Sequence, residues 1–248
     1  MSAYIGKGKI RLAPFASGDS FWERAFEDIE NTSVFRFSFS EQETTLPDYT
    51  NAGGGTDASQ KRIDAVTGQI DPRHYTAANL ARVLWGSSTA VAATPITGEA
   101  HKLRLGKFVP TKRIIDTSVP PVVKKGMDTI AATDYTVSPG GITFKDTVAL
   151  SGAIEGDDIT FDYTPQAGAN IQAIVTSAPT VSLHFEGVNA VTGKSMIVHG
   201  HKVKLGVAQN VDFIGDDFGT LTISLTFEKD DTITTPGLSQ YVEINEED

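Results

Sequence analysis

Apolar and polar residues alternate with a period of two in several stretches of the chain. The clearest are residues 34–40 (VFRFSFS), where Phe35, Phe37 and Phe39 share one face, and residues 221–227 (LTISLTF). This period is typical of a strand with one buried and one solvent-facing side. Residues 7–12, 62–70, 157–164, 181–185 and 197–205 add further strands. So many strands at this spacing predict a mostly β chain, built as a sandwich or barrel.

One short helix is predicted at residues 76–86 (TAANLARVLWG). Thr76 is a suitable N-cap, the following residues are good helix formers, and Gly86 stands where a C′ glycine is expected. Ala77, Leu80 and Leu84 fall on one face, so the helix is expected to pack against a sheet. Residues 21–29 fit either a strand or a turn of helix.

The character of the chain changes between residues 106 and 168. This segment is rich in turns, and residues 133–144 (TDYTVSPGGITF) predict two strands joined at Pro-Gly-Gly. We interpret 106–168 as a small inserted all-β domain. Residues 1–105 and 169–248 then form one discontinuous main domain.

Composition excludes several classes of protein. The chain of 248 residues has no cysteine, so disulfide scaffolds, iron–sulfur sites and cysteine zinc sites are ruled out. The net charge of -10 argues against a protein that grips nucleic acid through its phosphates. Residues 169–248 carry 4 cations and 11 acids, which is -7 of that total. The N-terminus shows no secretion signal and no apolar run reaches eighteen residues, so synthesis in the cytoplasm and no membrane span are expected.

A run of glycines at residues 46–62 (LPDYTNAGGGTDASQKR) resembles a phosphate-binding loop at first sight. A P-loop, however, places Gly-Lys-Ser/Thr between a strand and a helix. Here Thr56-Asp57-Ala58 follows the glycines, with no lysine at the required place, and the next element is predicted to be a strand. We therefore interpret the segment as the oversized tip of a hairpin formed by 34–43 and 62–70.

Candidate catalytic and metal-binding groups are few. His199 and His201 share one strand face, and His184 is a possible third ligand, but no carboxylate lies nearby in sequence. The acid pairs 157–158, 216–217 and 230–231 are adjacent residues in turn-like contexts and do not suit two-carboxylate catalysis. No Gly-x-Ser-x-Gly motif is present. The sequence predicts no enzyme, no cofactor and no metal.

Four stretches in a fixed order resemble the tail tube (major tail) proteins of long-tailed bacteriophages with non-contractile tails. They are residues 34–70, 75–86 (YTAANLARVLWG), 181–206 (VSLHFEGVNAVTGKSMIVHGHKVKLG) and 221–230 (LTISLTFEKD). The order of these stretches carries the resemblance, which spans most of the chain outside the inserted domain.

The resemblance implies two packed antiparallel sheets with a flanking helix, and subunits that form hexameric rings stacked into a hollow tube in the virion. Phage DNA would pass through without specific binding. The implied partners are further copies of the chain and the tail tip, tape-measure and tail terminator proteins. The inserted domain would lie outside the tube.

Within this reading, the hairpin tip is expected to reach a neighbouring subunit or ring. The contact residues expected there are Leu46, Pro47, Asp48, Tyr49, Gly53, Gly54, Gly55 and Thr56. Acids facing the DNA would repel phosphates and ease its passage. The candidates for such lumen acids are Glu41, Glu43 and Asp64.

Two alternatives stay open. The first is a β-rich carbohydrate-binding or adhesin module, which would present aromatic residues near turns. Tyr135 and Tyr163 are candidates for such a surface, although their place in strand patterns favours the core. The second is the tube protein of a contractile tail or of a type VI-like secretion system.

Overall fold

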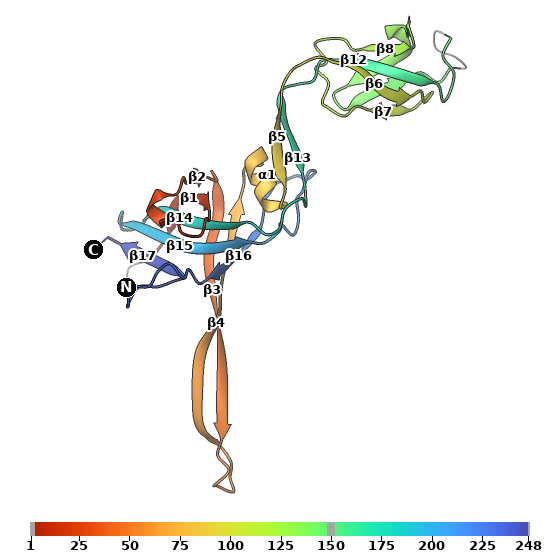
Figure 1. Cartoon of the computed structure of the whole chain (residues 1–248). Helices are drawn as coiled ribbons and strands as arrows, with labels where there is room; N and C mark the ends of the chain where they lie inside the picture. Colours follow the sequence, from red (N-terminus) through yellow and green to blue (C-terminus); the bar gives the residue numbers. More distant parts are fainter. Residues whose placement is uncertain (1–2, 148–151, 248) are drawn as a thin grey trace. The chain divides into compact units, whose positions relative to one another are not determined.

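The computed structural model describes residues 3–147 and 152–247, and the chain divides into two compact units. Unit 1 comprises Met1–Ser88 and Ile171–Asp248, and unit 2 comprises Thr89–Asn170. Strands account for 49% of the structure and helix for 5%, in several antiparallel sheets with one α-helix among the described residues (Figure 1). The predicted mostly β fold class is confirmed.

Unit 1 is built on one eight-stranded antiparallel sheet. The strand order is β2-β1-β14-β15-β16-β4-β3, and β17 pairs with β15. The bounds are β1 Gly6–Pro14, β2 Glu27–Asp28, β3 Thr32–Pro47, β4 Thr56–Pro72, β14 Thr180–Asn189, β15 Ser195–Leu205, β16 Ile223–Glu228 and β17 Val242–Glu246.

The large sheet curls so that its apolar face encloses a core. Phe35 on β3 packs against Phe185 on β14, with ring centroids 5.2 Å apart, although these strands are not neighbours in the sheet. The buried residues come from β1, β4, β14, β15 and β16, and the helix adds Val83. Alternation at residues 221–227 marks this inner face correctly, because Leu221, Ile223, Leu225 and Phe227 are all buried.

Helix α1, Ala77–Val83, begins as predicted and ends earlier. The Thr76 side chain caps it by accepting a hydrogen bond from the Asn79 backbone N–H at 3.2 Å. At the other end Trp85, not Gly86, takes the left-handed conformation, with φ of 47°. The Gly86 N–H donates to Ala81 O at 2.7 Å, which closes a Schellman turn. Gly86 is needed for another reason, since a Cβ there would lie 2.2 Å from Gln172 O.

The segment left open at residues 21–29 contains both kinds of structure. It forms a short 3-10 helix, η1 Phe21–Glu23, followed by the two-residue strand β2. Ser20 caps η1 by accepting from the Trp22 backbone N–H at 3.4 Å. The segment lies against β14 and β15, because Phe21 packs on His199 and Phe26 on His184, with ring centroids 4.9 and 5.8 Å apart.

Unit 2 has its own core between two small sheets. One has the order β6-β12-β8-β9 and the other β10-β11-β7, while β5 and β13 pair separately. The bounds are β5 Ser87–Val91, β6 Ile96–Lys102, β7 Phe108–Pro110, β8 Val122–Lys125, β9 Asp128–Thr129, η2 Ala132–Asp134, β10 Tyr135–Ser138, β11 Gly141–Phe144, β12 Asp158–Tyr163 and β13 Gly168–Gln172. Phe144 and Phe161 are its largest fully buried side chains.

The boundary expected at residue 106 is too late. Strand β6 pairs with β12 from Lys102↔Asp158 to Ile96↔Tyr163, so it belongs to the sheet of unit 2. Residues 96–102 show only a weak alternation of apolar and polar residues, because on β6 the side chain buried by the sheet is Glu99. The second boundary, at 168, falls two residues before the observed one.

Removing the N-cap of α1 gives a test of this local account. Thr76→Ala is expected to lower the free energy of unfolding of unit 1 by about 1 kcal/mol, because the Asn79 N–H loses its acceptor. Urea denaturation followed by tryptophan fluorescence reports on this unit, since Trp22 and Trp85 both lie in it. Thr76→Ser keeps the acceptor and should retain most of the stability. Equal losses in the two variants would contradict the role of the cap.

Candidate functional site

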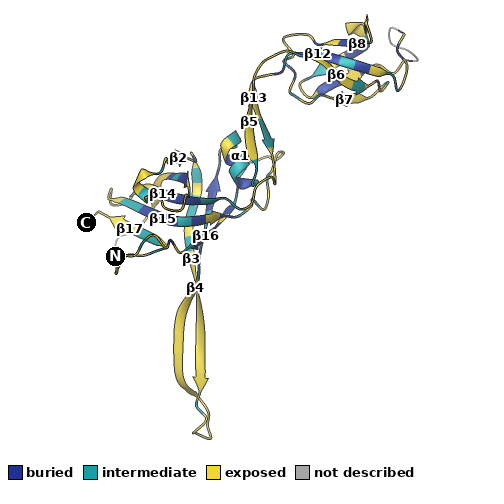
Figure 2. Cartoon of the chain, in the orientation of Figure 1, coloured by how far each residue is buried: buried dark blue, intermediate teal, exposed yellow. Residues whose placement is uncertain are grey.

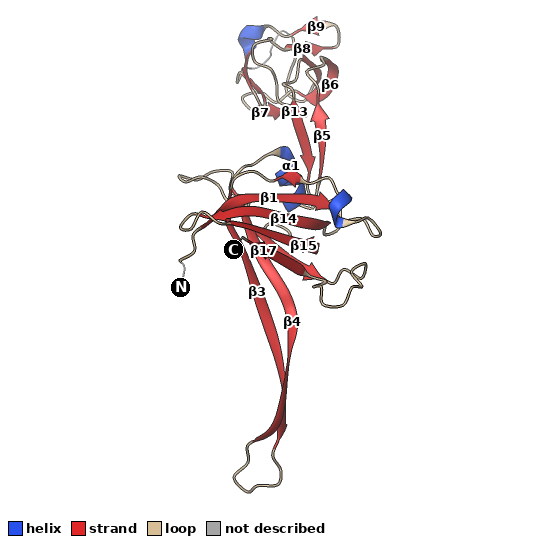
Figure 3. Cartoon of the chain, turned by 90° about the vertical axis from the view of Figure 1, so that its left-hand side faces the viewer, coloured by secondary structure: helices blue, strands red, loops and turns tan. Residues whose placement is uncertain are grey.

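The outstanding feature of unit 1 is a long two-stranded hairpin formed by β3 and β4. These strands pair from Thr32↔Pro72 to Pro47↔Thr56, whereas β16 covers β4 only from Val66 to Ile70. Beyond that point no other described strand joins the ribbon. Residues 38–47 and 56–64 are all exposed, as Figure 2 shows. About half of the hairpin therefore extends past the rest of the sheet (Figure 3).

The tip of the hairpin is shorter than predicted and is internally ordered. Leu46, Pro47 and Thr56 belong to the strands, so only residues 48–55 connect them. Asp48 organises this turn by accepting from Thr50 N at 2.7 Å, Thr50 Oγ1 at 2.6 Å and Asn51 Nδ2 at 2.5 Å. Hydrogen bonds from the hydroxyl and the backbone N–H of Thr50 and from the side chain of Asn51 lower the pKa of the Asp48 carboxyl to about 2. The strands run further than the sequence indicated because both faces are solvated there and no alternation marks them.

The glycines serve the turn itself. Gly54 and Gly55 have φ of 66° and 138°, which favour glycine, and the strand β4 begins directly after them. A P-loop would require a helix N-terminus after the glycines, but the element that follows the tip is the strand β4. Tyr49 is 84% exposed beside them, so the tip presents an aromatic ring to solvent.

The three candidate lumen acids do not form one row. Glu41 and Glu43 lie on the β3 face that carries Phe35 to Phe39, by the period of the strand. Asp64 is the extra residue of a β-bulge, because Ser40 pairs with Ala65 and Glu41 with Ile63. Glu43 also has a counterion, Lys61, at 3.8 Å. The alternation of the sequence does not reveal the bulge, so the sequence alone does not separate Asp64 from the other two acids.

Sequence reasoning missed the polar outer face of the curled sheet. Cross-strand partners Gln69↔Ser224 and Thr67↔Thr226 lie there, opposite to the buried side of β4 and β16. Arg36 donates to Gln69 from β3. Further along the sheet Lys202 and Lys204 both pair with Glu228, at 3.0 and 2.6 Å. The face is rich in hydroxyl and amide groups, and besides these three cations and Glu228 it carries Asp71, which accepts from Gln69 Nε2 at 2.7 Å. The sequence does indicate this face, because hydroxyl residues alternate with the apolar residues of 221–227.

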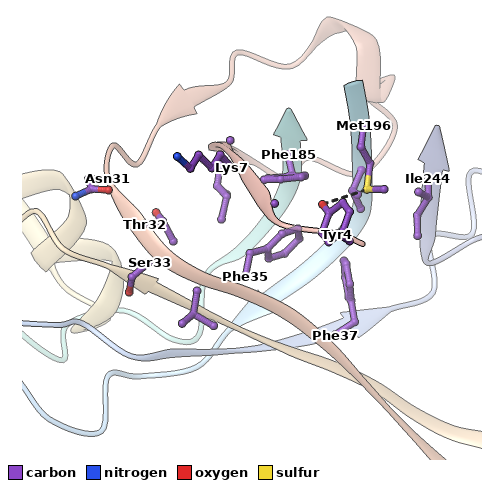
Figure 4. Close-up of a pocket in the computed structure, with 15 residues that line it drawn as sticks. Tyr4, Lys7, Asn31, Thr32, Ser33, Phe35, Phe37, Phe185, Met196 and Ile244 are labelled. Atoms are coloured by element: carbon purple, nitrogen blue, oxygen red, sulfur yellow. Dashed lines mark hydrogen bonds between the residues drawn. The ribbon is translucent and has the colours of Figure 1, made fainter. Parts of the chain in front are cut away.

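An apolar groove lies between β1 and the start of β3 (Figure 4). Its cavity volume is about 780 Å³. The Tyr4 hydroxyl donates to Met196 Sδ at 3.7 Å across it. Its apolar lining includes Tyr4, Phe35, Phe37, Phe185, Met196 and Ile244, and Lys7 stands among them.

Two free strand edges border this groove. Strand β3 pairs only with β4, and β1 pairs with β2 only at Arg11 and Leu12, within the part of the chain that the structure describes. The Phe185 ring lies against the glycine backbone below, since a Cβ at Gly8 or Gly187 would come within 2.7 or 2.3 Å of it. The groove is therefore an open seam in the curled sheet, with an aromatic floor.

The candidate histidines form a packed cluster instead of a metal site. His184 and His199 pair across β14 and β15, with rings stacked 5.1 Å apart. Phe21 covers His199 and His201 from η1, at 4.9 and 5.7 Å. Within the described part of the chain, Nδ1 of His199 has no hydrogen-bond partner, and a carboxylate oxygen of Glu243 lies 3.9 Å from it. Among the described residues, no group of three or more His, Asp or Glu is placed to hold a metal ion.

In two of the three adjacent acid pairs, each acid contacts a different partner. Asp157 pairs with Lys125 and Asp158 with Lys102, both at 2.7 Å. Asp230 accepts from Thr232 N at 3.0 Å in a turn, while Asp231 pairs with Lys229 at 2.8 Å. For Asp216 and Asp217 the described residues supply no ion-pair partner. None of the three pairs converges on a cleft.

A buried carboxylate that sequence reasoning missed is Glu99 in unit 2. Burial acts to raise its pKa, but three donors outweigh this effect and lower it. The donors are the Tyr163 hydroxyl at 2.8 Å, His101 Nε2 at 2.8 Å and the Lys112 backbone N–H at 3.0 Å. Burial and then the bond to Glu99 raise the pKa of Tyr163 to about 12. These contacts saturate the carboxylate, so Glu99 acts as a structural anchor of this core.

The chain matches a known protein family over nearly its whole length. Residues 3–245 match the family described as protein of unknown function UCP028589. The chain belongs to this family. A comparison with curated proteins found no match. Among the described residues, no helix is both long and apolar enough to cross a bilayer.

The histidine cluster predicts loss of stability in mild acid. Burial lowers the pKa values of His184, His199 and His201 below the ordinary 6.5. The unfolded chain then binds more protons than the folded one as the pH falls below about 6.5, so stability is full above that pH and declines below it. Each such group contributes a slope of up to about 1.4 kcal/mol per pH unit in that window.

The measurement is the free energy of unfolding of unit 1 between pH 7.5 and 5. His199→Phe should flatten its slope, because it removes one titrating ring from an aromatic setting. Phe26→Leu is the matched control, since Phe26 packs on His184 at 5.8 Å without titrating. An unchanged slope in His199→Phe would rule out this cause.

Proposed function

We propose that this protein is a structural subunit that assembles with copies of itself through the β3–β4 hairpin into a hollow tube. The observation that carries the proposal is the unsupported half of that hairpin. A two-stranded ribbon is marginally stable in water unless a third strand or another surface covers it. Within one subunit the described residues offer no such cover to positions 41–63.

The side chains of the ribbon support the same conclusion. Phe39 and Ile63 lie on one face where the hairpin leaves the sheet, and they are 66% and 56% exposed. Leu46 and Tyr49 are exposed near the tip, at 52% and 84%. Apolar side chains of this size along an open ribbon favour contact with another protein surface. A neighbouring copy supplies such a surface without a further partner.

The resemblance to phage tail tube proteins indicates how the copies would be arranged. Copies would close into hexameric rings, and stacked rings would make the tail tube of a non-contractile phage through which DNA passes. The outer face of the curled sheet suits a wall of the passage, because Thr67, Gln69, Ser224 and Thr226 offer polar groups without a continuous basic surface. The tape-measure, tail tip and tail terminator proteins are the further partners of this proposal.

The carbohydrate-binding alternative loses its expected surface. Tyr135 and Tyr163 are only 7% and 4% exposed, and the Tyr135 hydroxyl donates to Pro121 O at 3.0 Å. Rings held in this way cannot serve as stacking platforms for sugars. A tube protein of a contractile tail or of a secretion system stays as the second candidate, and the hairpin fits it equally well.

Shortening the hairpin tests the proposal. Gln42 and Arg62 form a register pair, so residues 43–61 are replaced by Asn-Gly, which suits a two-residue hairpin turn. The variant keeps the whole buried core of unit 1 and is expected to fold with the stability of the parent. It should remain small in sedimentation velocity and show no rings or tubes by electron microscopy.

The double variant Glu43→Gln/Lys61→Gln is the matched control, because it keeps the full hairpin and removes only the 3.8 Å ion pair. It should assemble as the parent does. Tubes of normal length from the shortened chain would refute the role of the hairpin.

A further inference from the structure

The connection between β15 and β16 carries an uncovered apolar group. Three large side chains stand in solvent within six residues: Phe213 is 79% exposed, Ile214 97% and Phe218 93%. Asp212, Asp216 and Asp217 lie between and beside them, and residues 206–220 contain no lysine or arginine. We name residues 212–218 the apolar loop. A monomer gains nothing from this arrangement, and such a patch with a charged rim is typical of an interaction site.

The apolar groove has the complementary chemistry. Its lining is mostly aromatic and aliphatic, and it lies open between two free strand edges. Lys7 stands in the lining and has no ion-pair partner among the described residues, whereas Lys9, two positions along the same strand, pairs with Asp28 at 3.8 Å. The groove thus offers apolar walls and positive charge to a loop that offers apolar side chains and negative charge.

The apolar loop does not cover the groove of its own subunit, since none of residues 212–218 is among the lining residues. It is held near α1, because Ala208 N donates to Val83 O at 2.8 Å and Arg73 Nη1 donates to Phe218 O at 3.3 Å.

We propose that the apolar loop of one subunit docks into the apolar groove of the next copy, with its aspartates against Lys7. This inference rests on the proposed self-assembly and adds a second contact to that of the hairpin. The two surfaces differ, so the contact is heterologous and each subunit uses both. Repetition of such a contact yields a closed ring or a continuing filament.

Cross-linking can test this contact directly because the chain has no cysteine. Ile214→Cys on the loop and Ile244→Cys at the groove both replace exposed side chains, at 97% and 58%. The two single variants are mixed at assembly concentration and treated with a short bis-maleimide. Dimers containing one of each are expected, and the double variant should give a ladder of covalent oligomers. Met127→Cys, 99% exposed in unit 2, is the control partner and should not react with Ile214→Cys.

A charge exchange supplies the second measurement. Lys7→Glu and Asp216→Lys/Asp217→Lys should each weaken assembly at least tenfold in critical concentration, and the combined variant should recover most of it. Cross-links only between two loops, or charge variants without effect, would overturn the contact. Tubes without the mixed cross-link would refute this inference and leave the proposed function standing. A ladder without tubes would support the contact and count against the tube.

Discussion

The packing of β3 against the far strands of its own sheet is the interaction on which the rest of unit 1 depends. Phe35 meets Phe185 at 5.2 Å and Phe37 meets Phe227 at 5.1 Å, so aromatic contacts hold the last strand over the core. These contacts curl the sheet, anchor one half of the hairpin and leave the other half free. Three of the rings, Phe35, Phe37 and Phe185, also line the apolar groove. One set of four rings therefore creates both the projecting ribbon and the seam.

The two units differ in net charge and in the kind of surface they expose. Unit 2 has 8 basic and 9 acidic residues and a core stabilised by the saturated Glu99 network. Unit 1 has 13 basic and 22 acidic residues, so it carries nearly all of the net charge. It also carries the free strand edges, the long ribbon and the apolar loop. Net negative charge makes separate copies repel one another, which would oppose aggregation before the proposed self-assembly.

Edge strands and exposed apolar side chains are a liability for a monomer. Here they recur at three places in one unit: the ribbon around Phe39 and Ile63, the apolar loop, and the seam between β1 and β3. The loop and the seam have opposite charge and matching apolar character. A surface built from complementary, non-identical patches is suited to contacts that repeat in one direction.

The sequence by itself determined the strands that bury one face, the single helix with its Thr76 cap, and the absence of any cysteine-based chemistry. Each of these follows from local periodicity or composition. Only the tertiary structure decided the length of the hairpin, the bulge at Asp64, and the start of unit 2 at β6. The outer half of the hairpin is solvated on both faces, and the buried side chain of β6 is the charged Glu99. Neither segment therefore shows an alternation of apolar residues, and only the backbone pairing reveals these strands. The groove, too, required the structure, since it exists only where distant strands of a curled sheet fail to meet.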